Sequence, residues 1–204
     1  MLAKTNKERL MKKSKMSTKD LILAGAFLAL YLVASMVVIF AFGFVPITWI
    51  FVPIITPLLM GPFFCLYTAK VPRCGAVLLL SLIVGLLANS TGYIYGIITA
   101  VVLAIVAELL ARAGQYKSKK MYTLSYMFFS VAYSTPFLML FLSKDVFLET
   151  TLSIAGPEFI TALEPLIPMW LFPAQVVGAL ITAFLGALLG QKLMKKHFEK
   201  ANII

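Results

Sequence analysis

The chain has 204 residues, of which 61% are hydrophobic and only 13% charged, and its mean hydropathy is +0.97. Several apolar runs reach the length of about 20 residues that crosses a bilayer core of roughly 30 Å, which excludes an ordinary soluble domain. The formal net charge of +10 would indicate nucleic-acid binding only if it formed a soluble basic face, and the basic residues instead flank the apolar runs. We therefore predict an all-α integral membrane protein.

A basic segment, residues 1–19, precedes the first apolar run. That run, residues 20–44, is longer than the roughly 7–15 apolar residues of a signal peptide, and no small-residue cleavage site leads into a soluble domain. We predict that it is retained as the first span. Within it, Gly25, Ala26 and Ala29 share one helical quadrant, a pattern of small residues that lets another helix approach closely.

Five more spans are predicted after the first. They lie at about residues 46–70, 75–92, 93–112, 122–143 and 169–194. The second contains Pro53, Pro57 and Pro62, and each proline predicts a kink because it removes a helical hydrogen bond. The last carries Gly178, Thr182, Gly186 and Gly190 at intervals of four, which favours close packing inside the bundle.

The segment between the fifth and sixth spans, residues 144–168, is the one long connection, and it holds four of the eight acidic residues. The sequence does not determine how this segment folds. One arrangement consistent with it is a lid over a pocket. The predicted organisation is the basic segment 1–19, a six-helix membrane domain over residues 20–194, and a tail over residues 195–204.

The basic residues predict the orientation of the chain. All 18 except Lys144 lie in the N-terminal segment, in the tail, in the loops after the second and fourth spans, or in the last residues of the spans that lead into these loops and the tail. Because positive residues stay on the cytoplasmic side, both termini are predicted to be cytoplasmic. The net positive charge is therefore explained by the orientation of the chain in the lipid bilayer. No nucleic-acid partner is expected. Cys65 and Cys74 lie near the cytoplasmic ends of their spans, where thiols stay reduced.

The sequence lacks the motifs of a self-sufficient enzyme. It contains no G-x-x-x-x-G-K-[ST] phosphate loop, no G-x-S-x-G and no H-E-x-x-H, so the chain is not expected to hydrolyse a nucleotide or to hold a catalytic metal. Apart from Asp20 at the very start of the first span, Glu108 is the one acidic residue within a predicted span, and its spacing from Arg112 favours an i,i+4 ion pair over a proton site. No enzyme activity, cofactor or metal is expected.

Polar and aromatic side chains gather in the predicted outer half. The amides of Asn89 and Gln175 are costly in hydrocarbon unless they are paired, either with another helix or with a ligand. The aromatic residues fit either an interfacial belt or the walls of a pocket. A pocket with aromatic walls and a few amides or hydroxyls suits a flat, neutral, polar small molecule. The candidate substrate-binding residues are Trp49, Asn89, Tyr93, Tyr95, Tyr133, Thr135, Trp170 and Gln175.

The order of these features resembles the S component of an energy-coupling factor (ECF) vitamin transporter, and within that group the Trep-Strep type of small integral membrane protein. The resemblance covers both ends of the chain and the predicted cytoplasmic loops. The matching stretches are STKDLILAGAFLALYLV, GPFFCLYTAKVPRCGAVLL, AELLARAGQYKSKK and GALLGQKLMKKHFEKA.

The resemblance implies a subunit of the bacterial plasma membrane that binds a vitamin or its precursor from outside. Such a subunit docks on a transmembrane coupling protein, the T component, which two cytoplasmic ATPases drive. The family's A-x-x-x-A motif contacts the T component, and it corresponds here to Gly25 and Ala29, broadened by Ala26. The resemblance also implies that the bundle topples in the membrane to open its pocket inward.

The substrate that this resemblance suggests is a pyrimidine or pyridine compound, such as hydroxymethylpyrimidine or pyridoxine. Two other functions remain open on the residues alone. A stand-alone facilitator or channel would move a small molecule without ATPase partners. A membrane scaffold would bind no small molecule at all.

Overall fold

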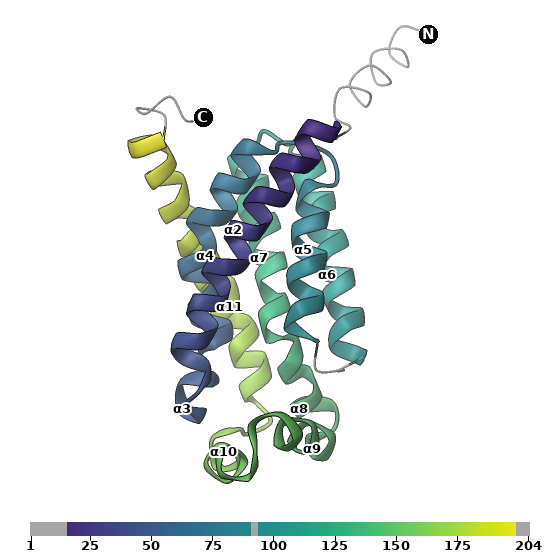
Figure 1. Cartoon of the computed structure of the whole chain (residues 1–204), viewed down its shortest axis with the longest axis vertical. Coiled ribbons are helices and arrows are strands. Elements are labelled where there is room, and N and C mark those ends of the chain that lie inside the picture. The colour runs from purple at the N-terminus through teal and green to yellow at the C-terminus, as the bar shows by residue number, and fades with distance from the viewer. Residues whose placement is uncertain (1–15, 91–93, 199–204) are drawn as a thin grey trace, which may run out of the picture.

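A computed structural model describes residues 16–90 and 94–198 of the chain. Long helices run side by side in a bundle, and shorter helices lie across one end of it (Figure 1). The separate long helices are α2 (Thr18–Gly43), α4 (Val52–Lys70), α5 (Ala76–Ala88), α6 (Ile94–Ala113) and α11 (Leu171–Leu193), and α11 continues into a π-helical turn, Met194–Phe198.

The predicted fifth span is a composite of three consecutive pieces. These are α7 (Lys119–Ser130), the 3₁₀ stretch η1 (Val131–Phe137) and α8 (Leu138–Leu142). Pro136 lies inside η1, and because proline has no N–H to donate, an uninterrupted α-helix is disfavoured there. The whole run, Lys119–Leu142, is 24 residues long and apolar enough to cross a membrane.

Five helices of the described chain are long and apolar enough to span a bilayer. The predicted third span is shorter than expected, because α5 has 13 residues and so measures about 20 Å at a rise of 1.5 Å per residue. Large apolar side chains such as Ile22, Val33 and Ile181 are more than half exposed on the outside of the bundle. Such surfaces suit lipid rather than water, so the all-α membrane fold is confirmed.

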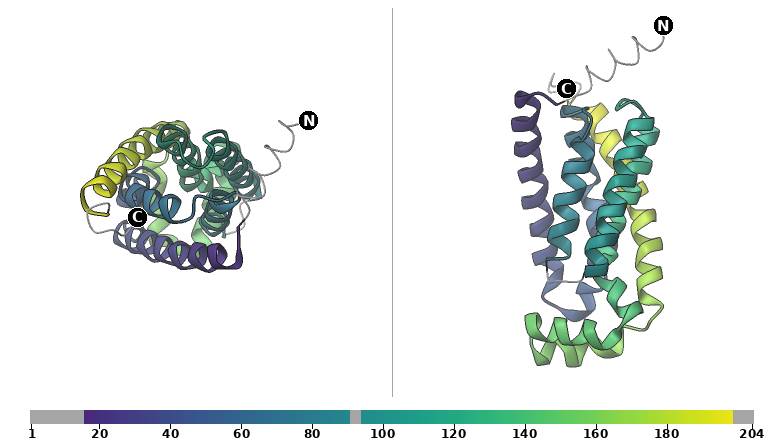
Figure 2. Two further views of the ribbon diagram at one scale, coloured as in Figure 1. Left: turned by 90° about the horizontal axis from the view of Figure 1, so that it is seen from above. Right: turned by 90° about the vertical axis from the view of Figure 1, so that its right-hand side faces the viewer.

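The two ends of the bundle differ in charge. The start of α2 and the end of α11 lie at the same end, together with the loops that join α4 to α5 and α6 to α7 (Figures 1 and 2). We call this the basic end, because the described lysines and arginines other than Lys144 lie there. Its exposure to the cytoplasm remains a prediction from the charge pattern.

The opposite end of the bundle is covered by the segment whose fold the sequence left open. It forms α9 (Lys144–Ala155), α10 (Pro157–Leu163) and the short turn η2 (Glu164–Leu166), which lie across the helix ends (Figures 1 and 2). Gly156 joins α9 to α10 with a φ of 85°, a conformation that favours glycine. We call this end the capped end.

The second predicted span is broken near its start. A short helix, α3 (Pro46–Trp49), is followed by α4, and Pro57 and Pro62 lie inside α4. Neighbouring helices supply donors for carbonyls along this segment, as a proline-rich membrane helix requires. Gln175 Nε2 donates to the Ile50 carbonyl at 2.8 Å, and the Tyr126 hydroxyl donates to the Pro57 carbonyl at 2.6 Å.

The glycines of α11 pack against α4. A Cβ added at Gly186 would lie 2.8 Å from the Leu58 carbonyl oxygen, and one at Gly190 would lie 2.7 Å from the Cys65 sulfur. These contacts leave no room for larger side chains. The glycine pattern of the last span therefore serves packing inside the bundle, as its spacing favoured.

Candidate functional site

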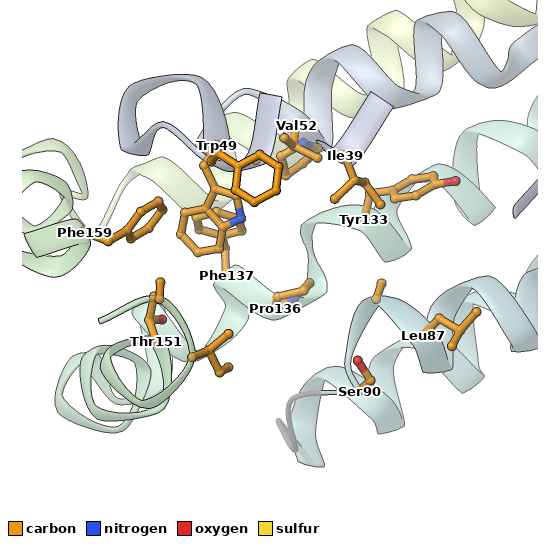
Figure 3. A pocket seen from close by; sticks show the side chains of 16 residues that line it. Ile39, Trp49, Val52, Leu87, Ser90, Tyr133, Pro136, Phe137, Thr151 and Phe159 are labelled. Carbon is orange, nitrogen blue, oxygen red and sulfur yellow. The ribbon is translucent and has the colours of Figure 1, made fainter. Parts of the chain in front are cut away.

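A cavity of about 580 Å³ lies under the capped end of the bundle. Its walls come from the end of α2, from α3 and the first turn of α4, from the end of α5, from η1, and from α9 and α10 (Figure 3). The volume falls within the roughly 300–1,000 Å³ typical of small-molecule sites. Segments distant in the sequence thus converge on one site, and the capping helices form part of its wall.

Aromatic rings line one side of this cavity. Trp49 on α3 packs with its ring centroid 4.7 Å from that of Phe137 and 5.7 Å from that of Phe159, which lies edge-on. Phe147 on α9 is fully buried behind them, 6.1 Å from Trp49. These contacts tie α3 to the capping helices, so the position of the Trp49 ring depends on both sides of the site.

The polar groups on the cavity wall are few and uncharged. They belong to Trp49, Ser90, Tyr133 and Thr151, and Figure 3 shows the Tyr133 hydroxyl directed away from the cavity. Tyr133 donates to the Tyr31 hydroxyl on α2 at 3.2 Å, and Thr151 donates to the Phe147 carbonyl at 2.7 Å. None of the sixteen lining residues is charged. Because an unpaired buried charge is costly, the site suits a neutral molecule with an apolar or aromatic body.

Three predicted site residues make helix–helix hydrogen bonds beside the cavity rather than lining it. Asn89 Nδ2 donates to the Thr135 hydroxyl at 2.7 Å and to the Gly85 carbonyl at 2.8 Å, and Thr135 in turn donates to the Ala132 carbonyl. Gln175 is bonded to Ile50, as described above. All three side chains are buried, and the amide nitrogens of Asn89 and Gln175 each bond to another helical segment, whereas their amide oxygens have no hydrogen-bond partner among the described residues.

The remaining predicted residues are dispersed. Trp49 and Tyr133 line the cavity, whereas Tyr95 on α6 and Trp170 at the start of α11 are 54% and 66% exposed on the outside of the bundle. That exposure fits an interfacial aromatic belt. Tyr93 lies outside the described residues.

The small-residue patch of α2, Gly25, Ala26 and Ala29, faces away from the bundle. A Cβ added at Gly25 would meet no atom within 4 Å. The inward face of the same helix is formed by Ala24 and Tyr31, which are fully buried. The patch is therefore unused by packing among the described residues, in contrast to the glycines of α11.

A family model described as a hypothetical bacterial integral membrane protein (Trep_Strep) matches residues 18–200. The chain belongs to the Trep_Strep family. The match runs from the start of α2 to beyond the end of α11, so it covers the whole described bundle. No curated protein and no solved structure was found to be similar to the chain. As a Trep_Strep protein with several apolar helices, it is a multi-pass bacterial membrane protein.

The predicted Glu108–Arg112 ion pair of this Trep_Strep protein is wrong. Glu108 instead caps the start of α5, because its carboxylate accepts the Gly75 N–H at 2.7 Å and the Leu78 N–H at 3.0 Å. The Tyr116 hydroxyl also donates to it at 2.8 Å. Burial, together with Cys74 and Glu108, raises the pKa of Tyr116 above its ordinary value, so the hydroxyl keeps its proton. The first N–H groups of a helix lack partners within the helix and favour a negative charge, which explains why the carboxylate lies at the start of α5.

Sequence reasoning missed most of the apolar wall of the Trep_Strep cavity. Phe137, Ile154 and Phe159 line it, and the last two come from the segment whose fold was left open. One signal was available in the spacing of Phe147, Thr151 and Ile154. Their intervals of four and three place them on one face of a helix, which indicates that this face packs inward.

Proposed function

We propose that this Trep_Strep chain is the substrate-binding membrane subunit, the S component, of an ATP-driven ECF importer. The observation that carries the proposal is the uncharged cavity of about 580 Å³ at the end of the bundle away from the basic loops. Since basic loops stay cytoplasmic, that end faces outside, where a nutrient is captured. The resemblance of the cytoplasmic loops to S components supports the same function.

The proposed substrate is a neutral ring compound, such as hydroxymethylpyrimidine or pyridoxine. The rings of Trp49, Phe137 and Phe159 offer faces for stacking, and the Ser90 hydroxyl offers a hydrogen bond. A multiply charged vitamin finds no counter-charge among the lining residues. Small, uncharged heterocycles with hydroxymethyl groups match this set best.

The proposed partner surface is the small-residue patch of α2. In the resembling family the equivalent motif meets helices of the T component, and here the patch is exposed with open space over Gly25. Small side chains let two helix backbones approach closely in a bilayer, where packing drives association. Two ATPases bound to the T component supply the energy, which agrees with the missing phosphate loop in this chain.

Extraction of a co-purified compound tests the binding function. The protein is purified in detergent, washed and denatured, and the supernatant is analysed by mass spectrometry. We expect about one small heterocycle per chain, released only on denaturation. A supernatant without any such compound, combined with no binding of added hydroxymethylpyrimidine or pyridoxine, would favour a scaffold instead.

A further inference from the structure

A second pocket lies at the basic end of the bundle, far from the cavity described above. It has a volume of about 300 Å³ and opens between the end of α4, the loop from α6 to α7, and the end of α11. Lys117 and Lys119 line it, together with apolar surface from Ala69, Pro72 and Met194. A cationic rim therefore adjoins an apolar wall.

Most other polar side chains of this second pocket are already engaged, whereas the Tyr122 hydroxyl has no hydrogen-bond partner among the described residues. Gln191 Nε2 donates to the Thr123 hydroxyl at 2.8 Å, Thr68 donates to the Phe64 carbonyl at 3.0 Å, and Tyr116 donates to Glu108. In contrast, Lys117 and Lys119 form no salt bridge with any carboxylate of the described residues. The two ammonium groups are thus the charged groups left to bind a ligand, and the Tyr122 hydroxyl lies on the same pocket wall. The ligand that fits two cations is an anion.

We propose that this second pocket binds the phosphate headgroup of an anionic phospholipid. The pocket lies where the apolar helices α4, α7 and α11 meet the basic loops, which is the depth of lipid headgroups. Basic pockets between membrane helices at this level hold anionic headgroups, and lysine binds phosphate as a point charge. The wall formed by Ala69, Pro72 and Met194 accommodates the glycerol and the first methylenes of a lipid, which a free inorganic phosphate lacks.

Native mass spectrometry of the full chain tests this assignment. The purified protein is mixed with equal amounts of phosphatidylglycerol and phosphatidylcholine that carry the same acyl chains. We expect one phosphatidylglycerol to be retained in preference to phosphatidylcholine. The double variant Lys117→Gln with Lys119→Gln should lower that retention by about tenfold or more, because each lysine near an anionic headgroup strengthens its binding.

A matched control separates a built pocket from general attraction to the basic end. Lys192 and Lys195 are exposed at the same end but do not line the pocket, so Lys192→Gln with Lys195→Gln removes equal charge. This control should retain phosphatidylglycerol like the wild type. Ala69→Trp, which fills the pocket without changing charge, should lose it. Ala69 is exposed, so the fold should tolerate the change.

Three outcomes would overturn the assignment. Equal retention of the two lipids shows that the pocket does not select for an anionic headgroup. An equal loss in the Lys192 and Lys195 variant shows that the attraction is diffuse. Displacement of the lipid by millimolar inorganic phosphate or glycerol phosphate shows that the pocket serves a soluble phosphate compound.

Discussion

Trp49 and Trp170 provide a matched pair of tryptophans for testing the cavity. Trp49 contacts Phe137 and Phe159 on the cavity wall, whereas Trp170 is 66% exposed outside it. We predict that Trp49→Ala weakens retention of the co-purified compound by about tenfold, since it removes the stacking ring. Trp170→Ala should leave retention unchanged. Quantitative mass spectrometry of the released compound measures both, and equal effects would place the substrate elsewhere.

Gln175 is predicted to act on stability rather than on binding. Its amide nitrogen is the donor to the Ile50 carbonyl at the break between α3 and α4, and the side chain is fully buried. Gln175→Leu leaves that carbonyl without a donor, which should cost about 1–3 kcal/mol. Thermal unfolding in detergent should show a lower Tm than the wild type. Gln191→Leu, which removes a half-buried amide from the other end, serves as the control with a smaller effect.

At the scale of single residues, the sequence indicated which side chains need a hydrogen-bond partner, but it did not predict which group in the structure is that partner. The cost of an unpaired amide correctly indicated that Asn89 and Gln175 need hydrogen bonds. It did not distinguish a helix partner from a ligand, because that depends on which helices meet at each depth. Glu108 shows the same limit, since Arg112 is near it in the sequence and the amides of Gly75 and Leu78 are near it only in space.

At the scale of helices, two small-residue surfaces invite opposite predictions. Gly186 of α11 packs against the backbone of α4, whereas Gly25 of α2 has open space around it. We predict that Gly186→Leu destabilises the bundle by several kcal/mol or prevents folding, because overpacking a tight contact is costly. Gly25→Leu combined with Ala29→Leu should leave Tm and substrate retention near wild type. Size-exclusion chromatography and thermal unfolding measure the difference.

The variant Gly25→Leu with Ala29→Leu should also fail to assemble with the T component. Larger side chains on the small-residue patch block close approach of another helix, so assembly with the T component should be lost. Co-purification with tagged T component and ATPases measures this directly. Gly25→Ala combined with Ala29→Gly keeps the patch small and should assemble normally. Full assembly of the leucine variant would remove the patch from the coupling interface.

The helices themselves were largely predictable from apolar length, because the bilayer sets the length of a span. The predicted and observed ends of the first and fourth spans agree closely. The interruptions were harder to predict. Pro136 is the residue in the fifth span that indicates an interruption of the helix. The extent of the interruption, η1, depends on its packing against α6 and α11. The shortness of α5 was not predicted, because the expected span ran to residue 92, whereas α5 ends at Ala88 and is followed by the polar residues Asn89 and Ser90.

At the scale of the whole molecule, the charge pattern predicted that the basic loops would lie at one end of the bundle, and the described basic residues other than Lys144 do gather there. The cavity at the other end was only partly predictable. Its walls combine α2, α3, α5, η1 and α9, and no local pattern reports which of these segments converge. The capping helices matter most here, since the sequence showed an acidic connection, whereas in the structure α9 and α10 lie across that end and supply part of the cavity wall (Figures 1 and 3).

Energised uptake in proteoliposomes tests the central claim most directly. The chain is reconstituted with the T component and the two ATPases, and uptake of the radiolabelled co-purified compound is followed with and without internal ATP. The S-component account predicts accumulation that needs ATP and all partners, and that is lost in the Gly25→Leu, Ala29→Leu variant. Uptake of the same compound by the chain alone, at equal rate without ATP, would contradict it and identify a facilitator.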